Sequence, residues 1–114
     1  MQAEARATIH NEFGLHMRPS TRFQEAASRF ASTVSVTVDV VHYTADGVVS
    51  RTGPETVSVN AKSLLELMGL GLPCGTEMLI QANGPDAQEA ITTLAALVED
   101  WFGLKNDPSE ISKA

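Results

Sequence analysis

Hydrophobic and polar residues alternate along four segments of the chain, and this period of two residues predicts a sheet. The alternation is clearest from Val34 to Val40, where a valine stands at every second position and β-branched side chains suit a pleated strand. The predicted strands cover residues 3–9, 34–40, 56–60 and 77–83. We expect the second and third of these to pair, and each strand to bury one face.

Three other segments repeat their apolar residues with the period of a helix. They predict helices over residues 18–31, 64–70 and about 86–102. The apolar stripes of the two long helices are Phe23, Ala26, Ala27 and Phe30, and Ile91, Leu94, Ala95 and Val98 with Trp101 or Phe102. Before the short helix, Ser63 and Glu66 have the spacing of a capping box, and Gly69 or Gly71 is expected to end it.

The predicted element order is β-α-β-β-α-β-α. It indicates an α+β two-layer sandwich, in which three helices cover one face of a four-stranded, mostly antiparallel sheet. We expect one domain over residues 1–102 and a polar C-terminal tail over residues 103–114 that frays.

Residues 42–55 form a long connection between the second and third strands. Asp46-Gly47 signals a hairpin turn, and Gly53-Pro54 interrupts the returning arm. Either a long hairpin that projects past the sheet or a mobile loop of the same length fits this pattern.

Composition narrows the class of protein. The 114 residues are 43% hydrophobic and 19% charged, as expected of one compact domain. A net charge of −6 and a pI near 4.9 argue against non-specific nucleic-acid binding, which needs a basic face. Neither a signal peptide nor a membrane segment is visible. The single cysteine, Cys74, cannot form an internal disulfide, so we expect a reducing cytosol, and its apolar neighbours suggest a packing role.

The segment from Phe13 to Ser20 holds the candidate reactive group. His16 stands directly before a predicted helix start, which Pro19 marks because proline is tolerated where its missing N–H has no intrahelical acceptor. The backbone N–H groups of Met17 and Arg18 then point outward with the positive end of the helix dipole, and the Arg18 guanidinium lies within reach. This arrangement predicts an anion site. A helix-capping or surface histidine also fits His16 taken alone.

Two separated motifs carry a family resemblance. The first is Gly14-Leu-His-Met-Arg-Pro19, and the second is Val59-Asn-Ala-Lys-Ser-Leu-Leu-Glu-Leu-Met-Gly-Leu-Gly71, followed by Gly75-Thr-Glu77. Together they resemble HPr, the histidine-containing phosphocarrier family of the bacterial phosphoenolpyruvate-dependent sugar phosphotransferase system. The resemblance covers roughly Ala3 to Phe102 and implies an open-faced β-sandwich with the element order given above.

By this resemblance His16 accepts a phosphoryl group on Nδ1 from enzyme I and passes it to a sugar-specific IIA domain or protein. Arg18 would bind the phosphoryl oxygens, as would the backbone N–H groups of Met17 and Arg18. Transfer between two histidines is nearly isoenergetic, so the protein needs positioning more than acid or base catalysis. The resemblance implies a monomeric cytoplasmic carrier, not an enzyme, that uses no cofactor and no metal.

The second motif adds regulatory and docking residues. Ser63 matches the position that an ATP-dependent HPr kinase/phosphorylase modifies in Gram-positive and some other bacteria, while its role as a helix N-cap explains the residue equally well. Leu65, Met68 and Thr21 are the expected partner-docking residues. Core packing is the rival explanation for the two apolar ones, and Leu64 and Leu67 fit that role better.

This chain departs from the family pattern in places. Glu66 replaces a small residue, and its charge would repel a phosphate on Ser63. It also lies on the surface that meets enzyme I. Met17 and Ser20 replace other small residues, and the connection over residues 42–55 is longer than in typical members.

Three alternatives stay open. One is a regulatory binding module that acts through Ser63 and the second helix on a transcriptional regulator, although His16 weighs against this as the sole role. Another is a carrier in a nitrogen-related relay. The third is a metal site of His10, His16 and His42, which come from separate elements without ligand spacing; His10 by itself reads as a solvated residue on the polar face of the first strand.

Overall fold

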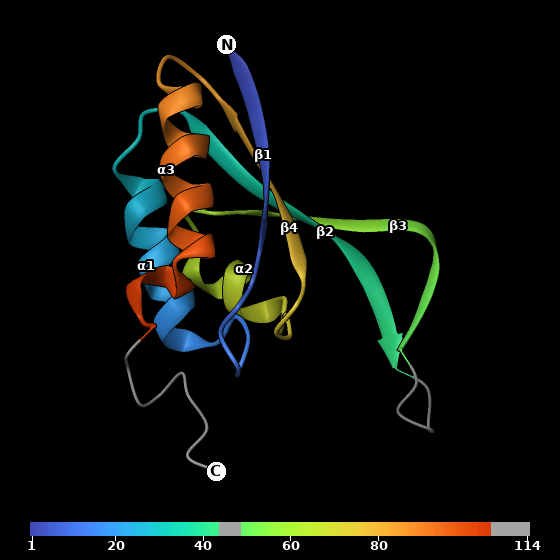
Figure 1. Ribbon diagram of the computed structural model, residues 1–114. Helices are drawn as coiled ribbons and strands as arrows, with labels where there is room; N and C mark the ends of the chain where they lie inside the picture. The colour runs from blue at the N-terminus through green and yellow to red at the C-terminus, as the bar shows by residue number, and fades with distance from the viewer. Residues whose placement is uncertain (44–48, 106–114) are drawn as a thin grey trace.

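The computed structural model describes residues 1–43 and 49–105, and the side chains of residues 39–55 lie outside this description (Figure 1). The elements are β1 (Gln2–Thr8), α1 (Met17–Ser28), β2 (Thr33–Tyr43), β3 (Val49–Asn60), α2 (Leu64–Gly69), β4 (Glu77–Asn83), α3 (Ala87–Glu99) and a 3₁₀ turn, η1 (Trp101–Gly103). The predicted α+β order is therefore confirmed, with η1 added at its end.

The four strands form one sheet in the order β1-β4-β2-β3, and every pair in the described residues is antiparallel. β1 pairs with β4 along its whole length, and the other edge of β4 pairs with Thr33 to Thr37 of β2. In Figure 1, α1 and α3 lie side by side against one face of this sheet, with α2 near their lower end. No helix of the described residues covers the opposite face of the sheet, and the predicted two-layer sandwich is confirmed.

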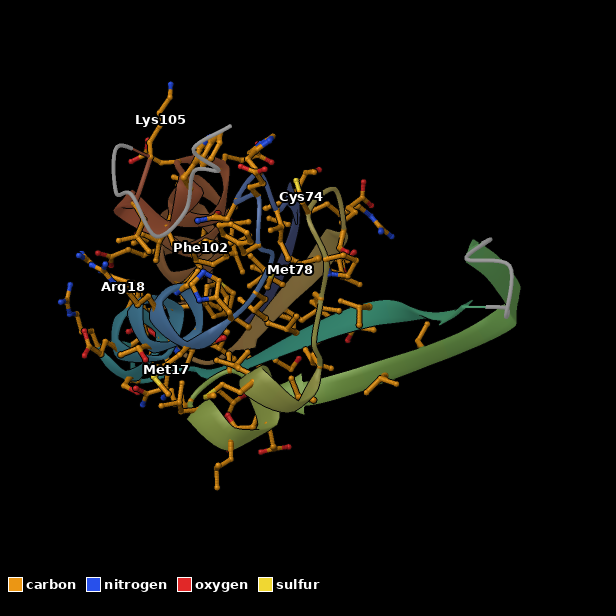
Figure 2. All side chains as sticks on the ribbon, turned by 90° about the horizontal axis from the view of Figure 1, so that it is seen from below. Met17, Arg18, Cys74, Met78, Phe102 and Lys105 are labelled. Atoms are coloured by element: carbon orange, nitrogen blue, oxygen red, sulfur yellow. The ribbon has the colours of Figure 1, made fainter. Side chains whose placement is uncertain are left out.

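The core fills the space between the sheet and the helices. Alternate residues of β2 and β4 point into it, so that Val36 and Ile80, which face each other in the register, are both fully buried. α1 contributes Phe23, whose ring meets the ring of Phe102 edge to face at 6.2 Å between centroids. Burying one such side chain contributes about 1.5–3 kcal/mol. Figure 2 shows Phe102 and Met78 within this layer.

The C-terminal end of the domain differs from the prediction. α3 ends at Glu99 because Trp101 and Phe102 take left-handed φ angles of 57° and 53°, which no helix continues. Phe102 is buried and Trp101 only half-buried, so Phe102 is the core residue of the two candidates. The reversal also buries Leu104, so the core includes one residue of the predicted tail. The rest of the predicted tail, residues 106–114, lies outside the described residues.

β2 and β3 continue as a two-stranded ribbon past the rest of the sheet. Pairing of β2 with β4 ends at Thr37, whereas pairing with β3 continues to Tyr43 opposite Val49, with a shift of register between Asp39 and Val41. Figure 1 shows this ribbon extending well away from the helices. The paired backbone is the arrangement expected of a hairpin, while its predicted turn at Asp46-Gly47 lies outside the described residues.

Several predicted boundaries shift. β3 begins at Val49 and not at residue 56. α1 runs from Met17 to Ser28, shorter than predicted at its end, because the backbone N–H groups of Ala31 and Ser32 both donate to the Asp86 carboxylate at 2.9 Å and turn the chain away. In the described parts of the chain, no helix has the length and apolar character to cross a membrane.

Cys74 corrects another prediction, since it is exposed and not part of the core, and its thiol lies 3.5 Å from the His10 carbonyl oxygen. The backbone N–H and the hydroxyl of Thr76 both donate to the Pro73 carbonyl oxygen, at 3.3 and 2.7 Å. These bonds close a turn with Cys74 at its corner, and Gly75 completes it with a φ of 89°. Two residues before Cys74, Leu72 is buried in the core.

Candidate functional site

The loop between β1 and α1 carries His16, and the backbone of residues 72–76 holds it. Ile9 exchanges two backbone hydrogen bonds with this segment, from its N–H to the Thr76 carbonyl at 2.9 Å and to its carbonyl from the Gly75 N–H at 2.8 Å. The Leu15 N–H donates to the Leu72 carbonyl at 2.8 Å. The loop is thus fixed at both ends by main-chain atoms.

A tight turn lies between these two anchors. The Gly14 N–H donates to the Asn11 carbonyl at 2.9 Å, which places Glu12 and Phe13 at the corners of the turn. Gly14 has a φ of 70°, and a Cβ atom there would lie 2.1 Å from the Leu72 carbonyl oxygen. Glycine is therefore required by both the backbone angle and the close approach.

A side-chain cluster ties the same loop to the end of α3. The Asn11 amide donates to the Trp101 carbonyl at 3.1 Å, and His10 Nε2 lies 2.7 Å from Glu99 Oε2. The His10 and Trp101 rings stack with centroids 6.5 Å apart. The Thr8 N–H donates to Glu99 Oε1 at 2.8 Å, and this bond, followed by the His10 contact, lowers the pKa of Glu99 below its usual value. His10 is a surface residue, as predicted, with its side chain 40% exposed, but it also contacts Glu99 at the end of α3.

His16 is the N-cap residue of α1, with φ −99° and ψ −163°, as its place in the sequence predicted. Its side chain makes no capping hydrogen bond, so the alternative of a helix-capping histidine is wrong. The first α-helical bond on this end runs from the Ser20 N–H to the His16 carbonyl at 3.0 Å. Met17, Arg18 and Pro19 precede this bond in the first turn of α1. Pro19 has no N–H, so the backbone N–H groups at this helix end are those of Met17 and Arg18. The imidazole Nε2 atom is buried.

The surroundings of His16 are exposed and partly apolar. Arg18 is exposed, and in Figure 2 both Met17 and Arg18 lie on the outside of the molecule, far from Cys74. Met17 is 61% exposed and Phe13 is 58% exposed. The Phe13 ring stands edge to face against the His16 imidazole, at 6.5 Å between centroids and 79° between planes. Sequence reasoning assigned no role to Phe13, although an aromatic residue in a turn just before the histidine was a usable signal.

α2 places the residues of the second motif. Ser63 is its N-cap, and its hydroxyl accepts from the Glu66 N–H at 3.4 Å. Leu65 is 85% exposed, Met68 is half-buried and Leu67 is fully buried, so Leu67 rather than Leu65 serves the core. Leu64 is only half-buried.

α2 also contacts α1, which carries His16 at its start. The half-buried Thr21 of α1 donates its hydroxyl to the Met17 carbonyl at 2.7 Å. Near the start of α2, the Lys62 carbonyl accepts from the Gln24 amide of α1 at 3.2 Å. The candidate docking residues therefore lie on two helices that touch.

Metal-ligating side chains do not gather in the part of the chain that the structure describes, where no group of three or more lies together. His10 is bonded to Glu99 and His16 lies at the start of α1, whereas the side chain of His42 falls outside the description. The structure thus gives no support to a shared site of the three histidines.

Comparison with known proteins identifies the family. The family model described as "PTS HPr component phosphorylation site" matches residues 3–100. This chain belongs to the HPr family. It is 34% identical over 96 residues to the phosphocarrier protein HPr of Cupriavidus necator, a match that covers 84% of this chain and 90% of that protein. It is also 33% identical to the HPr-like protein Crh of Bacillus subtilis, over 85% of this chain and 95% of that one.

The solved structures agree with this assignment to the HPr family. The crystal structure of HPr from Thermoanaerobacter tengcongensis superimposes with a TM-score of 0.68 at 35% identity, covering 89% of this chain and 96% of that one. The matched region includes both the His16 loop and α2, since the family model extends from residue 3 to residue 100.

Proposed function

We propose that this HPr-family chain is a phosphoryl carrier of the sugar phosphotransferase system. Nδ1 of His16 accepts a phosphoryl group from the phosphohistidine of enzyme I and passes it to a histidine of a IIA domain. The observation that carries the proposal is the position of His16 at the N-cap of α1, in a family defined by its phosphorylation site. The protein is consumed and regenerated in the relay, so it acts as a carrier and not as an enzyme.

The first turn of α1 supplies what such a transfer requires. The P–N bond to the donor histidine breaks, a new P–N bond forms at His16, and the electron pair of the broken bond stays on the donor ring. The Met17 and Arg18 N–H groups and the helix dipole favour the phosphoryl dianion. The exposed Arg18 guanidinium is suited to bind two of its oxygens.

Partner docking is proposed for the surface that combines the two touching helices. Leu65 of α2 is a large apolar side chain that is 85% exposed. Met68, also of α2, and Thr21 of the contacting helix α1 are half-buried. Exposed apolar side chains near a reactive group are typical of a contact surface. Enzyme I and the IIA domains would use this surface in turn.

The direct test uses phosphoenolpyruvate labelled with ³²P and purified enzyme I. We expect an acid-labile, base-stable label that is lost in His16→Ala and kept in His10→Ala. His10 is a matched control, because it is the other histidine whose side chain is described and it is bonded to Glu99. Labelling of His16→Ala at the level of the unchanged protein would refute the proposal.

The role of Arg18 has its own test. Charge-assisted hydrogen bonds to a phosphoryl group contribute about 1.5–3 kcal/mol, so Arg18→Ala should slow transfer from phospho-enzyme I by about ten- to a hundredfold. Arg22→Ala, an exposed arginine one turn further along α1, should leave the rate nearly unchanged. Equal effects of the two substitutions would show that only general charge matters.

A second candidate function rests on Ser63. Its position at the N-cap of α2, beside the exposed Leu65, and the similarity to Crh favour a regulatory docking module that a protein kinase modifies. A phosphate on Ser63 would gain from the helix N-terminus but would be opposed by the charge of Glu66, which is exposed in the first turn. Incubation with an HPr kinase and ATP tests this, and the expected label is absent in Ser63→Ala. If Glu66 opposes modification, Glu66→Ala is labelled faster.

A further inference from the structure

Phe13 is a large apolar side chain that the fold leaves 58% exposed. Its main described contact is the edge-to-face packing on the His16 imidazole, with centroids 6.5 Å apart and planes at 79°. Edge-to-face pairs of aromatic rings are attractive and have a defined geometry. The ring therefore lies against the reactive group rather than in the core.

The backbone fixes Phe13 in this place. The turn that carries it is closed by the bond from the Gly14 N–H to the Asn11 carbonyl, and Gly14 packs against the Leu72 carbonyl. Because main-chain atoms hold the turn, the phenyl ring is not needed to form it. The ring is nonetheless kept beside His16 while the loop stays folded.

We propose that Phe13 is the water-excluding and positioning residue of the phosphohistidine. Its ring shields one side of the P–N bond at His16 from water and limits rotation of the imidazole. This inference rests on the proposed phosphoryl transfer to His16.

The competing reaction is hydrolysis. A water oxygen attacks phosphorus, the bond from phosphorus to Nδ1 breaks, and its electron pair returns to the ring. The products are inorganic phosphate and unmodified His16. A site of this kind stays open to partner proteins, so it cannot be closed by a lid, and an apolar ring packed on the reactive imidazole is the simplest barrier to water. Met17, which is 61% exposed and adjacent in the chain, has no ring with which to make the same contact.

The lifetime of the isolated phosphoprotein tests this. The chain and its variants are phosphorylated with enzyme I and phosphoenolpyruvate, separated from both, and followed by ³¹P NMR at constant pH and temperature. Loss of a ring contact of this kind should speed release of phosphate from Phe13→Ala by about two- to tenfold. Phe13→Tyr should keep the lifetime of the unchanged protein, because it keeps the ring.

Two controls separate shielding from other effects. Val57→Ala removes an apolar side chain of β3 that is 41% exposed and lies outside the docking helices, and it should leave the lifetime unchanged. The urea midpoint of Phe13→Ala should stay close to that of the unchanged protein, because the side chain is mostly outside the core. Equal lifetimes for the unchanged protein and Phe13→Ala would overturn the role of Phe13 while leaving the carrier function intact. Failure of every variant and of the unchanged chain to form phosphohistidine would overturn both.

Discussion

Replacing Gly14 by alanine is the sharpest test of how the His16 loop is held. The Cβ atom would lie 2.1 Å from the Leu72 carbonyl oxygen and 2.9 Å from the Pro73 Cα. These neighbours are main-chain atoms that cannot turn aside, so the loop and the 72–73 segment must separate. Gly71 provides a matched control, because its φ of 56° is also left-handed but nothing lies within 4 Å of its Cβ position.

The two substitutions share one cost and differ in another. A non-glycine residue in the left-handed region costs about 1–2 kcal/mol, and this applies to both positions. At Gly14 the separation also weakens the hydrogen bond from the Leu15 N–H to the Leu72 carbonyl, worth about 0.5–1.5 kcal/mol, and opens packing around it. We expect Gly14→Ala to lose about 3–5 kcal/mol of unfolding free energy and Gly71→Ala about 1–2 kcal/mol.

Urea unfolding followed by circular dichroism measures both values. The dependence of the unfolding free energy on urea concentration, the m value, should be the same in both variants if the unfolded state is unchanged. In a domain of this size each kcal/mol lowers Tm by about 4 °C, so thermal melts give an independent measure. Phosphorylation of His16 should slow in Gly14→Ala and not in Gly71→Ala. A loss of stability in Gly14→Ala no larger than that in Gly71→Ala would refute the reasoning, since only the close approach distinguishes the two.

Three further predictions use the same unfolding assay. The Ser32 hydroxyl, then the Ala31 and Ser32 N–H groups, lower the pKa of Asp86, so its contribution to stability is present above pH 3.8 and is lost as the pH falls below that value; Asp86→Asn should flatten this dependence. Phe102→Ala should cost about 3–5 kcal/mol, whereas Phe13→Ala should cost under about 1 kcal/mol, and similar losses would contradict the assigned burial. Ser63→Ala should lower the unfolding free energy by about 0.5–1 kcal/mol and Ser63→Asn should leave it almost unchanged, because asparagine also caps helices. Equal losses for the two variants would contradict the capping role of the hydroxyl.

Features that depend on local sequence were predicted well. The valines from Val34 to Val38 point to the core, and Met78, Ile80 and Ala82 do so in β4, because a period of two residues assigns faces without knowledge of the partner strand. The position of His16 before the first helix follows equally from local signals. These are the parts of the fold in which each residue and its near neighbours determine the conformation.

Features that depend on chain reversal were not predicted. The residue types of Trp101 and Phe102 do not predict their left-handed φ angles, which are rare in residues other than glycine. Those angles end α3 and return Leu104 to the core, where the polar sequence beyond it suggested a tail. Cys74 was misjudged for a related reason: apolar neighbours in sequence were taken as neighbours in space, whereas the turn from Pro73 to Thr76 directs it outward.

The candidate site combines both kinds of feature. His16 and the Met17 and Arg18 N–H groups form a local unit, but the loop before them takes its shape from main-chain bonds to residues 72–76. Carbonyl and N–H groups make these bonds, the buried Asn11 and Leu15 add side-chain contacts, and Gly14 permits the close approach to Leu72, whereas Phe13 is 58% exposed. The Phe13 side chain is therefore not required to form the turn. A side chain that the turn does not require and that still packs on the reactive imidazole is best explained by what it does for the phosphohistidine.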